Sequence, residues 1–291
     1  MIFLYLYKHT NETQMKKYAT IFLLALCTTI TLAQKKEKLK GSKTVTTKFE
    51  EISNFKSIEV GDNIELYLEK GENARIKIEA DDNLHDIITK TVTDSTLYLS
   101  TTKEAYRYKK LIVHVTYTNS LKLITAKDEA NVNAIQEIQL DGIHLKSYND
   151  SKLFLNINSK NFNLESNDKS KTELNLKSEK AKIVLSQNSA LKALIKTDDL
   201  TFDMYQKTEA KIEGNTTNST IRLDNNAQFT GNKFTIKKLD LTAESYAVCS
   251  VNAENEVKIS ANGKAEVQLI GAAKIELEKF TDEAKLLKKL K

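Results

Sequence analysis

From Lys122 onward, apolar and polar residues alternate along the chain, and the alternation recurs as a unit of about 19 residues. A small residue marks the same anchor position in each unit: Ala130, Ser151, Ser170, Ser189, Thr208, Ala227, Ala247 and Ala265. Subtraction gives successive spacings of 21, 19, 19, 19, 19, 20 and 18 residues. A period of two is typical of strands, whereas a helical repeat would need apolar residues at i, i+3, i+4 and i+7.

Three further columns agree between the eight units. Six residues before the anchor stand Ile124, Leu145, Leu164, Ile183, Phe202, Ile221, Leu241 and Ile259. Two residues after it stand Val132, Leu153, Thr172, Leu191, Ala210, Phe229, Cys249 and Val267. Four residues after it stand Ala134, Leu155, Leu174, Ala193, Ile212, Gly231, Val251 and Leu269. We expect these columns to face inward and to form the core of a repeat protein whose coils stack on one another.

The pattern predicts an all-β fold, a single-chain parallel β-helix or β-solenoid with coils of about 19 residues. The repeat coils occupy 122–277, and alternating runs over 44–118 predict N-terminal strands that cap the same stack, so that the solenoid spans 44–280. We expect residues 281–291 to form a short C-terminal capping helix. Thr281 suits the N-cap, Asp282 and Glu283 suit the first turn, and lysines end the segment.

One column is polar although the alternation places it inside. Two residues before the anchor stand Asp128, Asn149, Asp168, Gln187, Gln206, Asn225, Ser245 and Gly263. The favoured interpretation is a structural ladder of amides and carboxylates that hydrogen-bond from coil to coil. The alternative is a cation or ligand site at Asp128, Asn149 and Asp168, because their oxygens are hard ligands. Against a shared ion, the two aspartates lie two coils apart, at ~9.6 Å.

Residues 1–33 read as an upstream extension followed by a signal peptide that starts at Met15. Lys16 and Lys17 precede an apolar region over 19–30, and the small-residue exit predicts cleavage between Ala33 and Gln34. Residues 34–43 would then be a linker. Because the apolar region is short for a membrane span, we expect an exported mature chain without a transmembrane segment. Its destination would be the periplasm, the outer membrane surface or the medium.

The chain has two cysteines. Cys27 lies in "LALC", which resembles a lipoprotein box, but Leu26 stands where Gly, Ala or Ser is usual, so lipid attachment is the less favoured alternative. Removal of the signal peptide leaves Cys249, which can form no internal disulfide and which we expect to be buried.

Composition and motifs argue against several classes of function. The net charge of +5 comes with lysines and glutamates interspersed, which does not favour nucleic-acid binding. We find no phosphate-binding loop, nucleophile elbow or zinc-ligand pair, and expect no catalytic residue, metal or cofactor. His85, His114 and His144 are isolated, and we expect surface or strand histidines rather than ligands or bases.

Part of the sequence resembles a known family. The residues that carry the resemblance are Phe55, Ile58, Val60 and Gly71, the strands over 64–68 and 76–80, the stretch "ADDNLHDIITKTV" over 80–92, and the pattern "L…A…A-x-V" from Leu123 to Val132. They resemble the head GIN domain of auto-transporter adhesins, a domain of largely unknown function. The resemblance implies an all-β, solenoid-like exported protein of the Gram-negative cell envelope and supplies no catalytic residues.

We therefore expect a non-enzymatic, adhesin-like binding or structural module whose partner is an extracellular glycan or an envelope protein. The alternative is a β-helical polysaccharide-degrading enzyme, which would gather carboxylates and basic residues on one outer face. The outward column directly before the anchor is mixed: Glu129, Asp150, Lys169, Asn188, Lys207, Asn226, Tyr246 and Lys264. Arg222 is the one arginine of the repeats.

Overall fold

The computed structural model describes residues 36–289 of the chain. It divides into two units, Met1–Lys38 and Leu39–Lys291, and the second contains all of the predicted repeats. The predicted signal peptide, its cleavage site at Ala33 and Gln34, and Cys27 all lie outside the described residues. Over 36–289 there is no helix with the length and apolar character needed to cross a bilayer.

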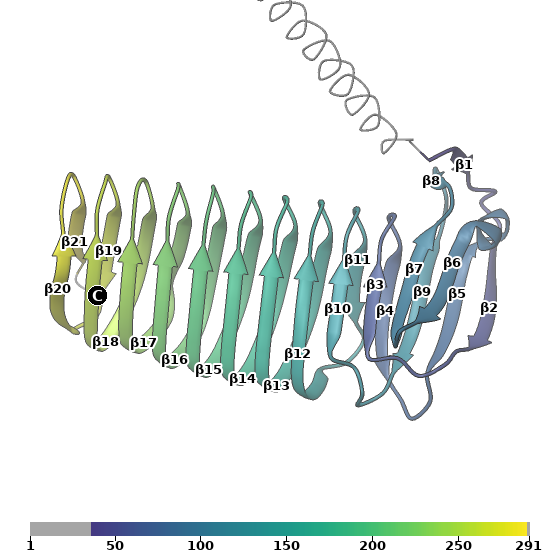
Figure 1. Cartoon of the computed structure of the whole chain (residues 1–291), viewed down its shortest axis with the longest axis horizontal. Coiled ribbons are helices and arrows are strands. Elements are labelled where there is room, and N and C mark those ends of the chain that lie inside the picture. The colour runs from purple at the N-terminus through teal and green to yellow at the C-terminus, as the bar shows by residue number, and fades with distance from the viewer. Residues whose placement is uncertain (1–35, 290–291) are drawn as a thin grey trace, which may run out of the picture. The chain divides into compact units, whose positions relative to one another are not determined.

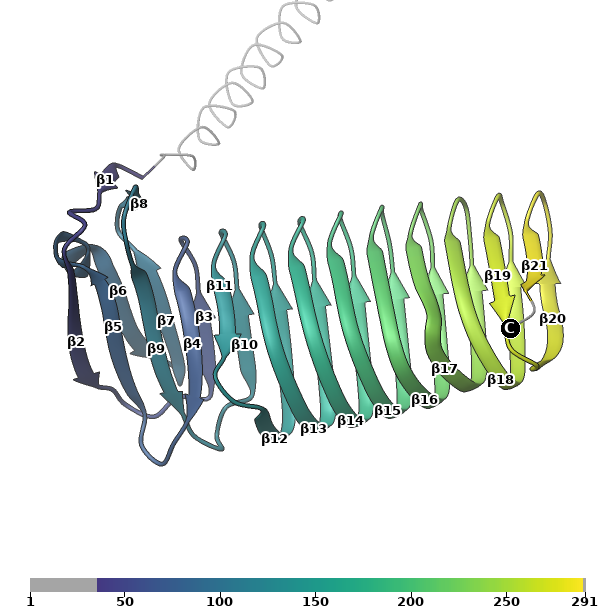
Figure 2. The same ribbon diagram turned by 180° about the vertical axis from the view of Figure 1, so that it is seen from behind.

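The second unit is a stack of coils, each of which runs along one sheet, reverses in a tight turn and returns along the other sheet (Figures 1 and 2). Six long strands repeat this path: β13 (Lys152–Ser166), β14 (Lys171–Leu185), β15 (Ala190–Met204), β16 (Glu209–Leu223), β17 (Gln228–Ala243) and β18 (Val248–Ala261). The first half of each lies in what we call the first sheet, and the second half lies in the second sheet. All neighbouring coils pair in parallel. The predicted β-solenoid is confirmed.

Bends join the two halves of each long strand, and hydroxyl side chains stabilise them from inside. Thr197 Oγ1 donates a hydrogen bond to the Glu179 carbonyl at 3.1 Å, and Thr216 Oγ1 donates one to the Asp198 carbonyl at 3.2 Å. Each hydroxyl thereby satisfies a backbone acceptor of the preceding coil at the point where the ladder bends.

The core lies between the two sheets and consists of the predicted columns. The column from Ile124 to Ile259 is fully buried, as is the anchor column from Ala130 to Ala265. The column from Val132 to Val267 is buried as well, and each of its members pairs directly with its neighbour in the next coil. Stacking therefore hides the apolar face of every coil behind the next one. Cys249 is buried as expected.

The expected inward direction of the polar column is wrong. Asp128 and Asn149 are exposed, and Asp168 is half-buried. In most coils these residues have positive φ, as does the residue after them, and the anchor N–H donates to the carbonyl three residues earlier. This is a type I′ turn, which reverses the chain in two residues and so breaks the alternation. Asn and Asp recur there because they tolerate the left-handed conformation.

The predicted helix over 281–291 is also wrong. The chain instead forms β20 (Lys274–Phe280) and β21 (Lys285–Lys289), which pair in parallel with β18 and with β19 (Glu266–Ile270). The turn between them repeats the earlier ones: Asp282 has a φ of 61°, and the Ala284 N–H donates to the Thr281 carbonyl. The sequence Thr281, Asp282 and Glu283 before the small Ala284 is compatible with a helix start and with this turn. The turn forms because it allows β21 to pair with β19 of the preceding coil.

The N-terminal strands cap the stack, as predicted, and they also contain a coil of the repeat. β3 (Ser57–Val60) and β4 (Glu65–Lys70) pair in parallel with β10 (Leu123–Ala126) and β11 (Asn131–Ala134). Asp62 and Asn63 form their positive-φ turn. The segment between β4 and β10 interrupts the spacing, which is why the sequence pattern does not reveal this coil.

Beyond that coil, β9 (Leu111–Tyr117) and β7 (Thr96–Thr101) still pair in parallel with β4 and β3, and the strands outside them are antiparallel. The first sheet continues through β9 and β5 (Arg75–Asp81) to β2 (Val45–Glu51), and the second through β7 to β6 (Ile88–Thr93). The 3₁₀ helix η2 (Asp82–Ile87) connects β5 to β6 and buries Leu84 and Ile87. The predicted linker 34–43 contains β1 (Lys38–Lys40), which pairs with β8 (Glu104–Tyr106). Between β11 and β13 lies β12 (Ile138–Ser147) of the second sheet.

Candidate functional site

The outer face of the first sheet carries one line of directly paired residues that crosses nine strands from the cap into the repeats. We call it the cross-strand row, and it consists of Phe49, Lys77, His114, Tyr67, Asn133, Phe154, Glu173, Lys192 and Lys211. Its neighbours lie one strand spacing apart, ~4.8 Å, so that the row runs along the stack and perpendicular to the strands. It presents two exposed phenylalanines, Phe49 at 73% and Phe154 at 41% of full exposure.

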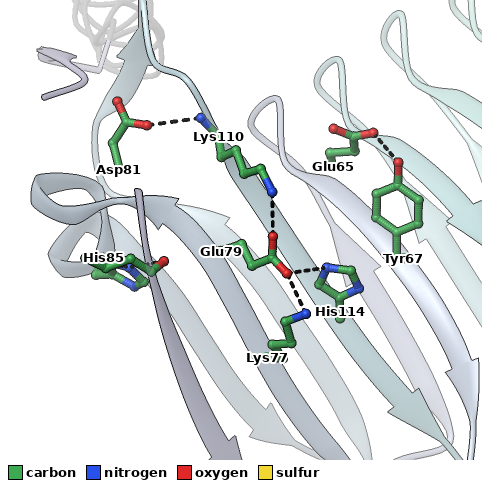
Figure 3. Close-up of polar contacts among 9 residues, drawn as sticks. Glu65, Tyr67, Lys77, Glu79, Asp81, His85, Lys110 and His114 are labelled. Carbon is green, nitrogen blue, oxygen red and sulfur yellow. Dashed lines mark hydrogen bonds and ion pairs between the residues drawn. The ribbon is translucent and has the colours of Figure 1, made fainter. Parts of the chain in front are cut away.

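Within the cap, the row passes over a cluster of polar side chains around Glu79 (Figure 3). Lys110 Nζ lies 2.7 Å from Glu79 Oε2, and Lys77 contacts the other carboxylate oxygen. Hydrogen bonds from Lys110 and Lys77 outweigh burial and lower the pKa of Glu79 to about 2. Glu79 is therefore a fixed anion at neutral pH, and it holds the two lysines at the surface of the sheet.

A ring pair comes next along the row. The Tyr67 and His114 rings stack at 5.3 Å with 21° between their planes, and the Tyr67 hydroxyl donates to Glu65 Oε1 at 2.7 Å. Burial, with a further contribution from Lys77, lowers the pKa of His114. The stack is a flat, uncharged element with defined geometry between charged neighbours, which suits contact with the apolar face of a ligand.

In the repeats, the row borders a shallow hollow of about 450 Å³ that extends over four coils. Its lining includes Phe154, Asn156, Asn175, Lys192 and Leu194. Asn175 Nδ2 donates to Asn156 Oδ1 at 2.6 Å, so the two amides form a short ladder across neighbouring strands. The free amide atoms and the lysine offer hydrogen-bond donors and acceptors, while Phe154 and Leu194 offer apolar contact.

A second hollow of about 390 Å³ adjoins the first and shares Glu173, Lys192 and Lys211 with it. Ala190 points outward and lines this second hollow. It pairs with Lys171 and Glu209 of the neighbouring strands, and its short side chain leaves space that a longer one would fill. The two hollows and the row form one continuous outer surface over β13 to β16.

Asp81 fixes the cap on which the row begins. The side chain is buried, and its carboxylate accepts backbone N–H bonds from Lys43 at 2.8 Å, Lys109 at 3.0 Å and Lys110 at 3.0 Å. Burial alone would raise the pKa of Asp81, but these donors outweigh it and hold the pKa below its ordinary value. A Cβ at Gly41 would overlap Asp81 Oδ2, so only glycine fits at that contact.

The predicted candidates Asp128, Asn149 and Asp168 lie together on the edge of the stack that the turns form. Asn149 Nδ2 donates to Asp128 Oδ1 at 3.0 Å, and the turns are further joined by backbone bonds, such as the Asp150 N–H to the Asp168 carbonyl. Over the described part of the chain, no three His, Cys, Asp or Glu side chains gather in a way that could hold a metal ion. A ligand role for the three residues stays a prediction.

The histidines occupy three different environments. His114 lies in β9 and His144 in β12, as expected for strand histidines, and His144 Nε2 is 3.0 Å from Glu165 Oε1. His85 differs from the expectation, because it is buried in η2, where Nε2 lies 2.9 Å from Thr46 Oγ1. The mixed outward column from Glu129 to Lys264 is exposed and occupies the second position of each turn.

Comparison with known proteins agrees with this architecture. The sequence profile of the family described as "Putative auto-transporter adhesin, head GIN domain" matches residues 54–193 and 164–273. The chain belongs to this family. The comparison with curated proteins gives no match.

Solved structures share the fold of this head GIN protein at low sequence identity. A structure described as a putative adhesin from Parabacteroides distasonis has a TM-score of 0.65 and 16% identity, with 87% of this chain and 100% of that chain covered. A structure described as a putative adhesin from Parabacteroides merdae has a TM-score of 0.60 and 18% sequence identity, with 87% of this chain and 99% of that chain covered. A structure described as a putative lipid binding protein from P. distasonis has a TM-score of 0.61 and 14% sequence identity, with 87% of this chain and 99% of that chain covered.

The cross-strand row was not predicted from the sequence. Its members in the repeats stand at a fixed distance after the anchor, but those in the cap, such as Phe49 and His114, lie in antiparallel strands outside the repeat. Only the pairing of β2, β5 and β9 with β4 brings them into line. A sequence signal does exist in the outward aromatic residues of alternating strands, since Phe49 and Phe154 stand where a solvated strand usually carries polar residues.

Proposed function

We propose that this protein is an exported, non-enzymatic, adhesin-like module of the bacterial cell envelope that binds an extended glycan along the cross-strand row. The observation that carries the proposal is the row itself, with Phe49 exposed at its cap end, Phe154 exposed in the repeats and the amide-lined hollow beside Phe154. A sugar ring has one apolar face and a rim of hydroxyl groups. Aromatic rings and planar amides are complementary to these two parts.

The regularity of the surface supports an extended partner rather than a compact one. Phe49 and Phe154 are five strand steps apart, ~24 Å, which a single small ligand does not span. Repeat proteins use such long faces to contact elongated partners. Membership of the head GIN family and the predicted signal peptide support a location in the envelope, in the periplasm, at the outer membrane surface or outside the cell.

An envelope protein as partner and a polysaccharide-degrading activity are the two competing proposals. A stable protein interface needs more than ~1,000 Å² of buried surface, whereas the observed surface is a narrow row beside shallow hollows. For the enzyme, paired carboxylates would have to flank one sugar bond. Two carboxylates line the first hollow, Glu173 and Glu213, but they lie on β14 and β16, two strand spacings or ~9.6 Å apart across the sheet and further offset along the strands. This separation is larger than the one that paired carboxylates of glycosidases show.

A glycan array probed with the mature chain, beginning at Gln34, tests the proposal. We expect binding to at least one envelope polysaccharide without turnover, and loss of that binding in Phe154→Ala. The matched control is Tyr98→Ala, because Tyr98 is equally exposed, at 39%, but lies on the second sheet. Equal loss in both variants, absence of glycan binding, or release of shortened saccharides would each refute the proposal.

A further inference from the structure

The C-terminal end of the stack exposes side chains that every earlier coil buries. Ile275, Leu277 and Phe280 of β20 occupy the columns that Val257, Ile259 and Ala261 fill one coil earlier. The earlier residues are fully buried, but Leu277 is 50% exposed, and Ile275 and Phe280 are more than a third exposed. We call this surface the end face. Its apolar character is a direct result of the repeat, because each coil presents a face built to be covered by the next.

The end face also presents two strand edges. Over residues 36–289, β20 and β21 pair with the preceding coil alone, and no strand pairs with their outer sides. Lys288 pairs with Leu269 and therefore stands in a column that is apolar in the preceding coil. Its Nζ donates a hydrogen bond to the Gly271 carbonyl, in the segment between β19 and β20, and this contact places the ammonium group there. The remaining surface combines apolar side chains with backbone donors and acceptors at open strand edges, which is the usual composition of a strand-pairing interface.

We propose that the end face pairs with the end face of a second copy of this chain, forming a two-fold symmetric, tail-to-tail dimer. A two-fold axis makes both partners present the same surface, so the exposed apolar columns of one copy meet those of the other. Head-to-tail stacking fits less well, because the opposite end of the unit carries polar side chains such as Lys90, which pairs with Glu50.

The charges of the two strands select between the two symmetric arrangements. β20 carries Glu276 and Glu278, which lie beside Lys258, together with Lys274 and Lys279, so its charges are mixed. The charged residues of β21 are all lysines: Lys285, Lys288 and Lys289. If β20 paired with β20 of the partner and β21 with β21 of the partner, the lysines of the two β21 strands would face each other across the interface. A two-fold axis parallel to the strands instead places β20 of one copy antiparallel to β21 of the other, so that the lysines of β21 face a strand that contains two glutamates rather than a second strand of lysines. Opposite charges across strands are favourable and like charges are not.

Analytical ultracentrifugation of the mature chain, from Gln34 to Lys291, tests the proposal. We expect a concentration-dependent dimer that Leu277→Asp converts to monomer while the circular dichroism spectrum stays unchanged. The matched control is Leu194→Asp, at a residue equally exposed but located on the outer face of the first sheet, and it should leave the dimer intact. A monomer at every soluble concentration, a filament, or a dimer that Leu277→Asp leaves intact would overturn the proposal.

Charge reversal tests the arrangement of the strands. Glu276→Lys with Glu278→Lys should weaken the dimer at least tenfold, and adding Lys285→Glu with Lys289→Glu in the same chain should restore it. Restoration is expected only when β20 faces β21 of the partner, because like-with-like pairing would leave the fourfold variant with facing like charges. Failure of the fourfold variant to dimerise, with its fold intact, would overturn the arrangement.

Discussion

Replacement of Asp81 by asparagine tests whether the cap depends on this buried carboxylate. Oδ2 accepts the N–H of Lys43, Oδ1 accepts the N–H of Lys110, and Lys109 is shared between the two oxygens. Asn keeps one acceptor oxygen and turns an NH₂ group toward at least one N–H donor. Hydrogen bonds to charged groups contribute ~1.5–3 kcal/mol each, so we expect Asp81→Asn to cost ~2–4 kcal/mol of unfolding free energy.

Urea denaturation at neutral pH, followed by far-ultraviolet circular dichroism because the chain has no tryptophan, measures this loss. Amide exchange at Lys43, Lys109 and Lys110 reports whether the loss arises in the cap. The control is Asp86→Asn, an exposed neighbour in η2 that should change stability by less than ~0.5 kcal/mol. If Asp81→Asn stays within the same ~0.5 kcal/mol of wild type, the reasoning is refuted.

Acid titration gives the same prediction a second, independent readout. Because the folded-state pKa of Asp81 is lowered, its carboxylate stabilises the fold above the unfolded pKa of ~3.9, and this contribution is lost as the pH falls through the lower folded pKa. The difference in unfolding free energy between wild type and Asp81→Asn should therefore shrink over this acidic range. A difference that is constant or grows as the pH falls would contradict the assignment.

Three further predictions concern the repeats. Gly214→Ala should lower the unfolding free energy by at least ~2 kcal/mol, because φ is +110° and the new Cβ would overlap the Ile195 carbonyl oxygen. The control Gly142→Ala, measured in the same thermal unfolding assay, should stay within ~1 kcal/mol of wild type because its Cβ has room. Gln206→Asn should stabilise by ~0.5 kcal/mol, because φ is 58° and Asn tolerates that conformation better; a lower melting temperature would count against the type I′ assignment. Cys249, whose pKa burial raises to about 12, should resist a thiol reagent in the native mature chain and react fully in denaturant, and rapid native labelling would show that the core opens.

The repeated columns made the fold readable from the sequence, since alternation and a constant period both report burial in a stacked coil. The same alternation misled at the turns, where two residues of positive φ, such as Asn149 and Asp150, interrupt the period of two. It also misled at the C-terminus. Thr281 and Asp282 fit a helix start locally, and only the pairing of β21 with β19 favours the strand.

The candidate site was harder to predict because it depends on pairing between distant segments. Phe49 and Phe154 are 105 residues apart in the sequence, and they share a row only because β2, β5 and β9 extend the first sheet. Surface residues are also free of the packing constraints that fixed the core columns. Their pattern therefore carries little information until the register is known.

The most direct test of the account is a titration of wild type, Phe49→Ala, Phe154→Ala and the double variant, each as the chain from Gln34 onward, with the polysaccharide that the glycan array identifies. If one extended ligand runs along the cross-strand row, each single variant weakens binding of the same ligand, and the losses in binding free energy add in the double variant, because the two sites are ~24 Å apart. Loss in only one single variant, or in neither, would contradict binding along the row.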